Sequence, residues 1–65
     1  MYANLKNALQ RKGISIKEYA KFLNVSEKTI ANKFNESTDF TYREYRETCK
    51  MLFPEYNPDY LFATE

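Results

Sequence analysis

The chain has 65 residues, of which 43% are hydrophobic and 17% aromatic, and its formal net charge is +1. A chain of this size buries only about 60% of the surface that its unfolded form exposes, so we expect a single domain, residues 1–65, with a thin core. It has no histidine and one cysteine, Cys49, which excludes an internal disulfide and any Cys–His or Ser–His catalytic pair. No apolar run is long enough to span a membrane, and no signal-peptide pattern is present. We therefore expect an intracellular protein that is not an enzyme.

Charge is distributed unevenly along the chain. Residues 1–36 carry seven Lys or Arg against three Glu, a net charge of +4, whereas residues 37–65 carry three against six acids, a net charge of −3. Such asymmetry between halves is typical of a protein with one side that faces a polyanion.

Three helices are predicted in the first half. Leu5, Ala8 and Leu9 follow helical spacing, and Gly13 offers a left-handed stop. Ser15-Ile-Lys-Glu18 matches the capping box S-x-x-E, which opens a second helix with Tyr19, Ala20 and Leu23 on one face. Asn24 tolerates positive φ, and Ser26 can then cap a third helix that carries Thr29, Ile30 and Phe34.

Two further helices are predicted in the second half, after a polar loop at residues 35–40. Thr41-Tyr-Arg-Glu44 is a second capping box, which opens a helix with Tyr42, Tyr45, Cys49 and Leu52 on one stripe, and Pro54 ends it. Asn57 and Pro58 supply the cap and first position of a last short helix through Tyr60, Leu61 and Phe62. Strand signals are nearly absent, so the predicted fold class is all-α, a compact domain of five helices.

The second and third helices share a turn of about three residues, Asn24-Val25-Ser26, which is the geometry of a helix-turn-helix motif at about residues 15–35. Such a motif needs a small side chain where the helices cross, and Ala20 supplies it. It also needs positive φ at the turn, which Asn24 can adopt. With its apolar face pinned to the second helix, the third helix must turn its polar face outward.

This pattern resembles that of the lambda-repressor-like helix-turn-helix regulators, in particular the small Cro-type, repressor-type and XRE-like proteins of phages and mobile elements. The resemblance covers roughly residues 4–62, including "TDF" at 38–40 and "DYLF" at 59–62. The residues that carry it are Gly13, Ile14, Ser15, Tyr19, Ala20, Leu23, Asn24, Val25, Ser26, Thr29, Ile30 and Asn35. Three positions depart from the family: Ile16 replaces a common Gln, Asn24 replaces a common Gly, and Glu36 follows the third helix where Gly is common.

The resemblance implies that the third helix enters the major groove and reads bases. The implied base-reading residues are Glu27, Lys28, Thr29 and Asn32. Lys28 can donate to guanine, Asn32 can pair bidentately with adenine, and Glu27 can accept from cytosine. Thr29 can offer its methyl group to thymine or its hydroxyl to a phosphate. For Glu27 an alternative is open, because an acid in the first turn also stabilises the helix dipole.

Phosphate contacts are expected from backbone amides at the starts of the second and third helices and from polar side chains nearby. The expected phosphate-contacting residues are Ser15, Lys17, Ser26, Lys33, Asn35 and Ser37, with Lys21 as a weaker candidate. The lysines can instead simply solvate helix faces, and the two serines are helix caps first. Glu36 would oppose DNA binding unless it points away or forms an ion pair.

The resemblance therefore implies sequence-specific binding of double-stranded DNA by a phage- or prophage-type transcriptional regulator, located in the cytoplasm at the bacterial nucleoid or in a phage-infected cell. We expect a homodimer on a pseudo-palindromic operator, with an interface after residue 36 to which Tyr56, Tyr60 and Phe62 are candidates; alternatively these rings close the core of one subunit. No cofactor, metal, membrane or small-molecule substrate is expected. The alternative function is a protein-binding helical adaptor or anti-repressor that does not read DNA, which the modest net charge, Ile16 and Glu36 favour.

Overall fold

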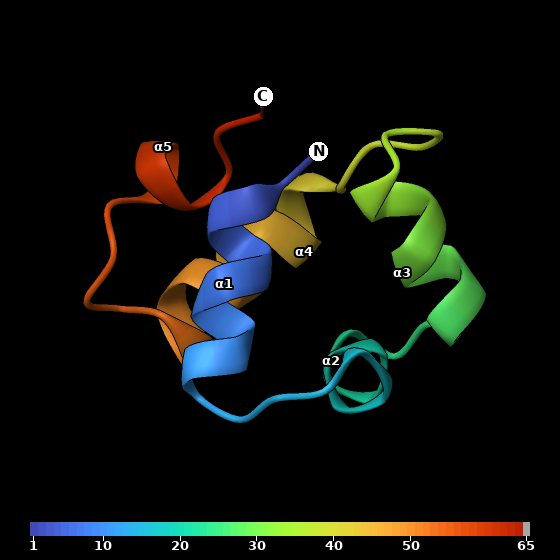
Figure 1. Ribbon diagram of the computed structural model, residues 1–65, viewed down its shortest axis with the longest axis horizontal. Coiled ribbons are helices and arrows are strands. Elements are labelled where there is room, and N and C mark those ends of the chain that lie inside the picture. Colours follow the sequence, from blue (N-terminus) through green and yellow to red (C-terminus); the bar gives the residue numbers. More distant parts are fainter. Residues whose placement is uncertain (65) are drawn as a thin grey trace.

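The computed structural model describes residues 1–64 and is built from five short α-helices (Figure 1). These residues form no β-strand, which confirms the predicted all-α fold class. The helices are α1 (Ala3–Arg11), α2 (Ile16–Leu23), α3 (Glu27–Phe34), α4 (Tyr42–Glu47), which continues into a π-helical turn η1 (Thr48–Leu52), and α5 (Pro58–Leu61).

Side-chain caps start four of the five helices. At α2, the Ser15 hydroxyl accepts from the Glu18 N–H at 3.1 Å, and the Glu18 carboxylate accepts from the Ser15 N–H at 2.9 Å. Thr41 and Glu44 make the same reciprocal pair at α4, with distances of 3.1 and 2.8 Å. Ser26 caps α3 and Asn57 caps α5 with their side-chain oxygens. The capping residues predicted from the sequence are thus confirmed, because each satisfies backbone donors that have no partner inside the helix.

A residue with left-handed backbone conformation follows each of the first three helices within two positions of its last residue. These residues are Gly13, Asn24 and Glu36, with φ of 70°, 62° and 62°. In each case the next residue donates back to a carbonyl inside the helix: Ile14 to Leu9, Val25 to Ala20 and Ser37 to Asn32, each at 2.9 Å. The turn between α2 and α3 therefore has a defined geometry, and Asn24 adopts the positive φ expected for it.

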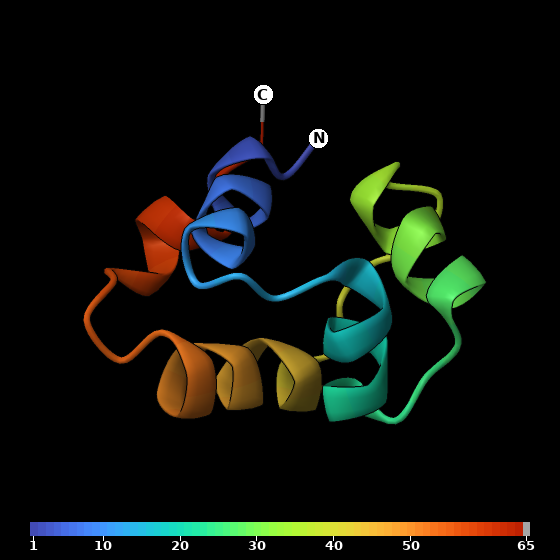
Figure 2. The same ribbon diagram turned by 60° about the horizontal axis from the view of Figure 1, so that its bottom comes forward.

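The core is one cluster with members from α1, α2, α3, η1 and α5. Its buried hydrophobic residues are Leu5, Ala8, Leu9, Tyr19, Ala20, Leu23, Ile30, Phe34, Cys49, Phe53 and Leu61. Helix α1 packs beside α5 on the left of Figures 1 and 2, and α2 and α3 pack together on the right. In Figure 2, α4 with η1 runs below α1 and beside α2. The buried side chains of α2 and α3 therefore pack in the same core as those of α1, η1 and α5.

Inside this core, the Tyr19 hydroxyl shares a hydrogen bond of 2.7 Å with the Thr48 hydroxyl. Both residues are fully buried, and burial raises the pKa of Tyr19 well above its ordinary value. Burial also raises the pKa of the Cys49 thiol, as expected for a cysteine that packs as a small hydrophobe. The Tyr19–Thr48 hydrogen bond links α2 to the start of η1. Separating the two helices would leave two buried hydroxyl groups without a partner, which is costly.

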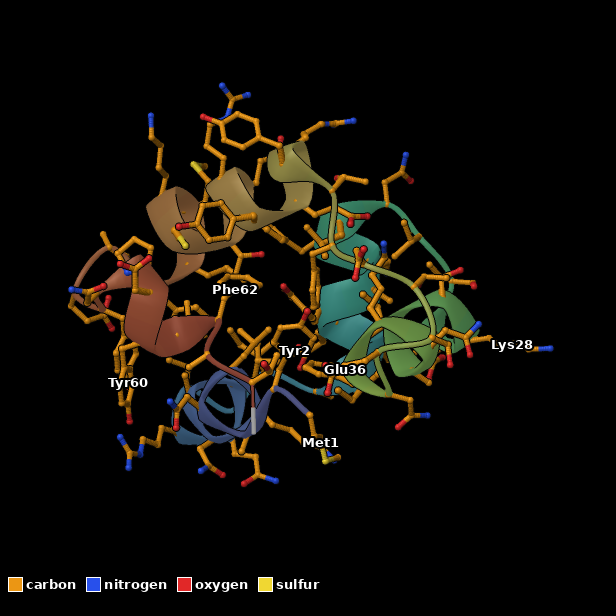
Figure 3. The ribbon with its side chains drawn as sticks, turned by 90° about the horizontal axis from the view of Figure 1, so that it is seen from above. Met1, Tyr2, Lys28, Glu36, Tyr60 and Phe62 are labelled. Carbon is orange, nitrogen blue, oxygen red and sulfur yellow. The ribbon has the colours of Figure 1, made fainter. Side chains whose placement is uncertain are left out.

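Phe40, in the segment between α3 and α4, joins several rings into one aromatic cluster. Its ring centre lies 5.1 Å from that of Tyr2, 6.1 Å from Phe34 and 5.2 Å from Phe62, always edge to face. The ring centres of Tyr2 and Phe62 lie 6.1 Å apart, and Figure 3 shows both residues near the centre of the molecule. The edge-to-face arrangement is the favoured one for aromatic pairs. Phe40 therefore anchors the polar segment that follows α3.

The stripe predicted for the fourth helix is only partly correct. Cys49 is buried and Tyr45 and Leu52 pack against the core, but Tyr42 is 74% exposed. Glu44 and Thr48 are buried on this helix instead. The helix ends before Pro54 as predicted, although its last turn is π-helical, with the Phe53 N–H donating to the Thr48 carbonyl at 3.1 Å. The buried side of α4 thus carries Glu44, and Tyr42 faces solvent.

Candidate nucleic-acid interface

Helix α3 has one buried and one exposed side. Ile30 is fully buried and Phe34 is 4% exposed, and both belong to the core. Glu27 and Lys28 are exposed, and Figure 3 shows Lys28 extending into solvent beyond the end of α3. Asn32, one helical turn further on, is partly exposed. Residues four apart share a helix face, so Lys28 and Asn32 lie on the same side of α3.

The first turn of α3 fixes two of its hydroxyl groups. The Ser26 hydroxyl accepts from the Thr29 N–H at 3.1 Å and shares a second hydrogen bond of 2.8 Å with the Thr29 hydroxyl. The Thr29 hydroxyl is therefore engaged locally, and Thr29 is only partly exposed. Its methyl group is the part best suited to an outside contact.

A groove of about 360 Å³ separates α2 from the start of α3. Ala20 and Val25 contribute its apolar part, and Ala20 is 2% exposed at the point where the two helices meet. The polar residues that line it are Lys17, Lys21, Ser26 and Glu27. The structure thus brings the expected phosphate contacts Lys17 and Ser26 together with Glu27 and with Lys21, the weaker candidate.

The start of α2 lies next to this groove. Ser15 is exposed, but its hydroxyl and N–H are both occupied by Glu18. Hydrogen bonds from Ser15, first from its N–H and then from its hydroxyl, hold the pKa of Glu18 below its ordinary value. Ile16 and Lys17 follow at the first two helical positions, where backbone N–H groups have no carbonyl partner within the helix. An anion at this end would be met by backbone amides and the Lys17 side chain rather than by the Ser15 hydroxyl.

Lys33 corrects one expectation. It was expected to reach a phosphate, but it is only 6% exposed. Its ammonium group lies 2.8 Å from the Glu44 carboxylate and donates to the Asp39 carbonyl at 3.0 Å, with the Phe40 ring 5.6 Å away. Lys33 is therefore a structural link between α3 and α4 and has no ammonium group free for DNA.

The partner of Lys33 is held in its charged form. Burial alone would raise the pKa of Glu44, but hydrogen bonds from Lys33 and from the Thr41 N–H outweigh it, so the pKa lies below its ordinary value. Glu44 is 9% exposed and serves both the ion pair and the α4 capping box. The same carboxylate thus fixes the start of α4 and the end of α3.

Beyond α3, Asn35, Glu36 and Ser37 are all exposed. The Glu36 carboxylate forms an ion pair with the N-terminal amine of Met1, and both residues are labelled in Figure 3. We expected Glu36 to oppose DNA binding unless it points away or forms an ion pair, and the structure shows such an ion pair.

Lys6 is a residue that the sequence analysis missed. It lines a small hollow of about 150 Å³ together with Asn35, Ile16 and Ala31. The hollow places an α1 lysine next to the end of α3 and the start of α2. No spacing along the sequence could reveal this neighbour, because residues 6 and 35 come together only through the tertiary fold.

Comparisons with models of protein families, with curated proteins and with solved structures found no match to this chain. Within residues 1–64, no helix is both long and apolar enough to cross a membrane. The same residues contain no group of three or more His, Cys, Asp or Glu side chains placed to hold a metal ion.

Proposed function

We propose that this chain is a sequence-specific double-stranded DNA-binding protein of the phage or prophage regulator kind, and that α3 is its recognition helix. The observation that supports this most is the two-sided character of α3. Ile30 and Phe34 hold its inner side in the core, while Lys28 and Asn32 occupy the outer side. A short polar helix presented in this way has the dimensions to enter the major groove, where its N-terminal residues meet base edges.

In this proposal the base-reading residues are Glu27, Lys28, Thr29 and Asn32, with Thr29 acting through its methyl group. The phosphate-contacting residues are Ser15 through its helix end, Lys17, Ser26, Asn35 and Ser37, to which we add Lys6 and Lys21. Lys33 is no longer among them. Lys21 borders the hollow at the start of α3 and Lys6 borders the hollow at its end, so a phosphate backbone near either end would meet positive charge.

A single unit of this size touches few bases, so we propose a homodimer on a pseudo-palindromic site with half-sites about 10 bp apart. The expected interface residues differ in exposure. Phe62 and Tyr56 pack against the core, whereas Tyr60 is 51% exposed and stacks on Tyr56 at 6.2 Å. Tyr60 is therefore the best candidate for contact with a second copy. Such a dimer would block or redirect transcription in the cytoplasm without catalysing a reaction.

The experiment that tests this function is selection of duplexes from a random library, followed by an affinity titration of the enriched sequence. With about five neutralised phosphates, log K falls by about 4.5 per tenfold rise in salt, so a fourfold rise weakens binding about 500-fold. A scrambled duplex of the same composition is the control. Failure to enrich any sequence, or equal affinity for both duplexes, would overturn the proposal.

The second candidate is a protein-binding helical module that does not read DNA. The burial of Lys33 favours this candidate, because it leaves one cation fewer on the exposed surface of α3. Ile16 also favours it, because an apolar side chain stands where a polar one would suit DNA better. A folded chain that binds no duplex even at low salt would decide for this candidate.

A further inference from the structure

A second groove lies on another side of the molecule, between α2 and the outer face of α4 and η1. Its volume is about 380 Å³, and it is lined by Phe22, Arg43, Arg46, Glu47, Lys50 and Met51. None of these residues belongs to α3. In Figure 3 the α4–η1 ribbon is at the top, with nitrogen-tipped side chains pointing upward, whereas Lys28 points to the right. The groove thus lies on a different side of the molecule from Lys28.

The groove is basic, although most of its residues come from the acidic half of the chain. Residues 37–65 have a net charge of −3, yet all three of their basic residues, Arg43, Arg46 and Lys50, line this one groove. Glu47 is the single acid among the lining residues, and it pairs with Arg43 at 3.4 Å. The basic residues of this half are therefore gathered in the groove, whereas most of its acidic residues lie elsewhere. Arg46 and Lys50 have no acidic partner among the groove residues.

The groove also exposes apolar surface that the core does not use. Met51 is 70% exposed, and Tyr42, 74% exposed, lies just outside the groove with the Arg46 guanidinium 5.7 Å from its ring centre. Phe22 is half-buried at the α2 wall. Apolar groups gathered within a basic rim are a feature of interaction sites rather than of ordinary solvated surface. Methionine is well suited to such a site because its flexible side chain adapts to a partner.

We propose that this groove binds an acidic amphipathic segment of a partner protein. An apolar side chain of that segment inserts between Phe22 and Met51, and its carboxylates pair with Arg43, Arg46 and Lys50. This is the mode in which a helix lies in a groove with apolar anchors and charged flanks. A nucleic acid fits less well, because its continuous row of phosphates would meet Glu47 and would leave the apolar floor without a partner.

The test is an NMR titration of the 15N-labelled full chain with a synthetic acidic peptide of about 15 residues, a length that can form a helix. The peptide carries Leu or Phe at positions i, i+3, i+4 and i+7 and Asp or Glu elsewhere. We expect its largest amide shift changes at Phe22 and along residues 43–51. A matched peptide with Ser in place of Leu and Phe should bind at least about tenfold more weakly.

Variants of exposed residues test the roles assigned to the groove. Exchanging Arg46→Glu together with Lys50→Glu should weaken peptide binding at least about tenfold, and Met51→Ser about fivefold. Arg11→Glu, a charge reversal on exposed α1 surface, is the control and should leave the affinity within about twofold.

Several results would overturn the docking proposal: peptide shifts that fall outside the groove, an affinity that the groove variants leave unchanged, or equal binding of the serine peptide. A duplex or single-stranded oligonucleotide that shifts the groove amides while the peptide does not would assign the groove to nucleic acid instead. Because no α3 residue lines the groove, failure of the DNA proposal alone would leave the peptide result unchanged.

Discussion

Replacing Lys33 by Met removes an ammonium group from the interior while keeping most of the side-chain length. The Glu44 carboxylate then loses its partner at 2.8 Å but keeps its hydrogen bond of 2.8 Å from the Thr41 N–H. Breaking a buried ion pair costs about 3–5 kcal/mol, and we expect the lower end, about 3 kcal/mol, because Thr41 still bonds the carboxylate. A domain of this length has about 3–10 kcal/mol in total, so the loss is large.

The assay is urea unfolding followed by circular dichroism, with Lys28→Met as the control. Lys28 is exposed on the same helix, so its replacement should change the free energy of unfolding by less than about 0.5 kcal/mol. A double-mutant cycle with Glu44→Gln should give a coupling energy of at least about 1 kcal/mol. A Lys33→Met variant as stable as Lys28→Met would refute the assignment of Lys33 as a structural link.

The same pair predicts a pH dependence. The pKa of Glu44 is lower in the folded chain than in the unfolded chain, so its stabilising contribution is present above the unfolded pKa of about 4.3. It is lost as the pH falls through the folded pKa. The free energy of unfolding should therefore decrease more steeply below about pH 4.3 in the parent chain than in Glu44→Gln. Parallel pH profiles of the two proteins would contradict this.

Three further substitutions test the α2–α3 pair, each by urea unfolding. Asn24→Ala should cost about 1 kcal/mol, because alanine lacks the short polar side chain that lets asparagine tolerate a φ of 62°, whereas Asn24→Gly should change stability by only a few tenths because glycine has no Cβ; equal effects would refute the argument. Tyr19→Phe leaves the buried Thr48 hydroxyl without its partner and should cost about 1–2 kcal/mol. Ala20→Leu overfills the contact between the helices and should cost about 1–3 kcal/mol, and a neutral result would mean that the contact is loose.

Local features of the fold could be predicted from the sequence because their causes are local. The capping boxes at Ser15 and Thr41 need only two residues three positions apart, and the stops at Gly13 and Asn24 need only a residue that tolerates positive φ. Glu36 was not foreseen as a third left-handed residue. Its conformation follows from the end of α3, where the Ser37 N–H bonds back to the Asn32 carbonyl, and glutamate gives no signal for it.

Features that depend on tertiary contacts could not be predicted. Lys33 looked like one more surface lysine because its partner, Glu44, lies in another helix and meets it only after the segment anchored by Phe40 has turned back. Tyr42 looked like part of an apolar stripe, since helical spacing cannot tell which of two possible faces is turned inward. The closeness of Lys6 to Asn35 likewise arises only from the packing of α1.

The central claim is that the outer side of α3 reads bases, and the most direct measurement is base discrimination by Lys28→Ala and Asn32→Ala. Each variant is titrated by fluorescence anisotropy against the selected duplex and against duplexes changed at one base pair. We predict that each loses about 1–3 kcal/mol of discrimination at one position while its unfolding curve stays unchanged. If both variants discriminate among the duplexes as well as the parent chain does, α3 is not the reading helix.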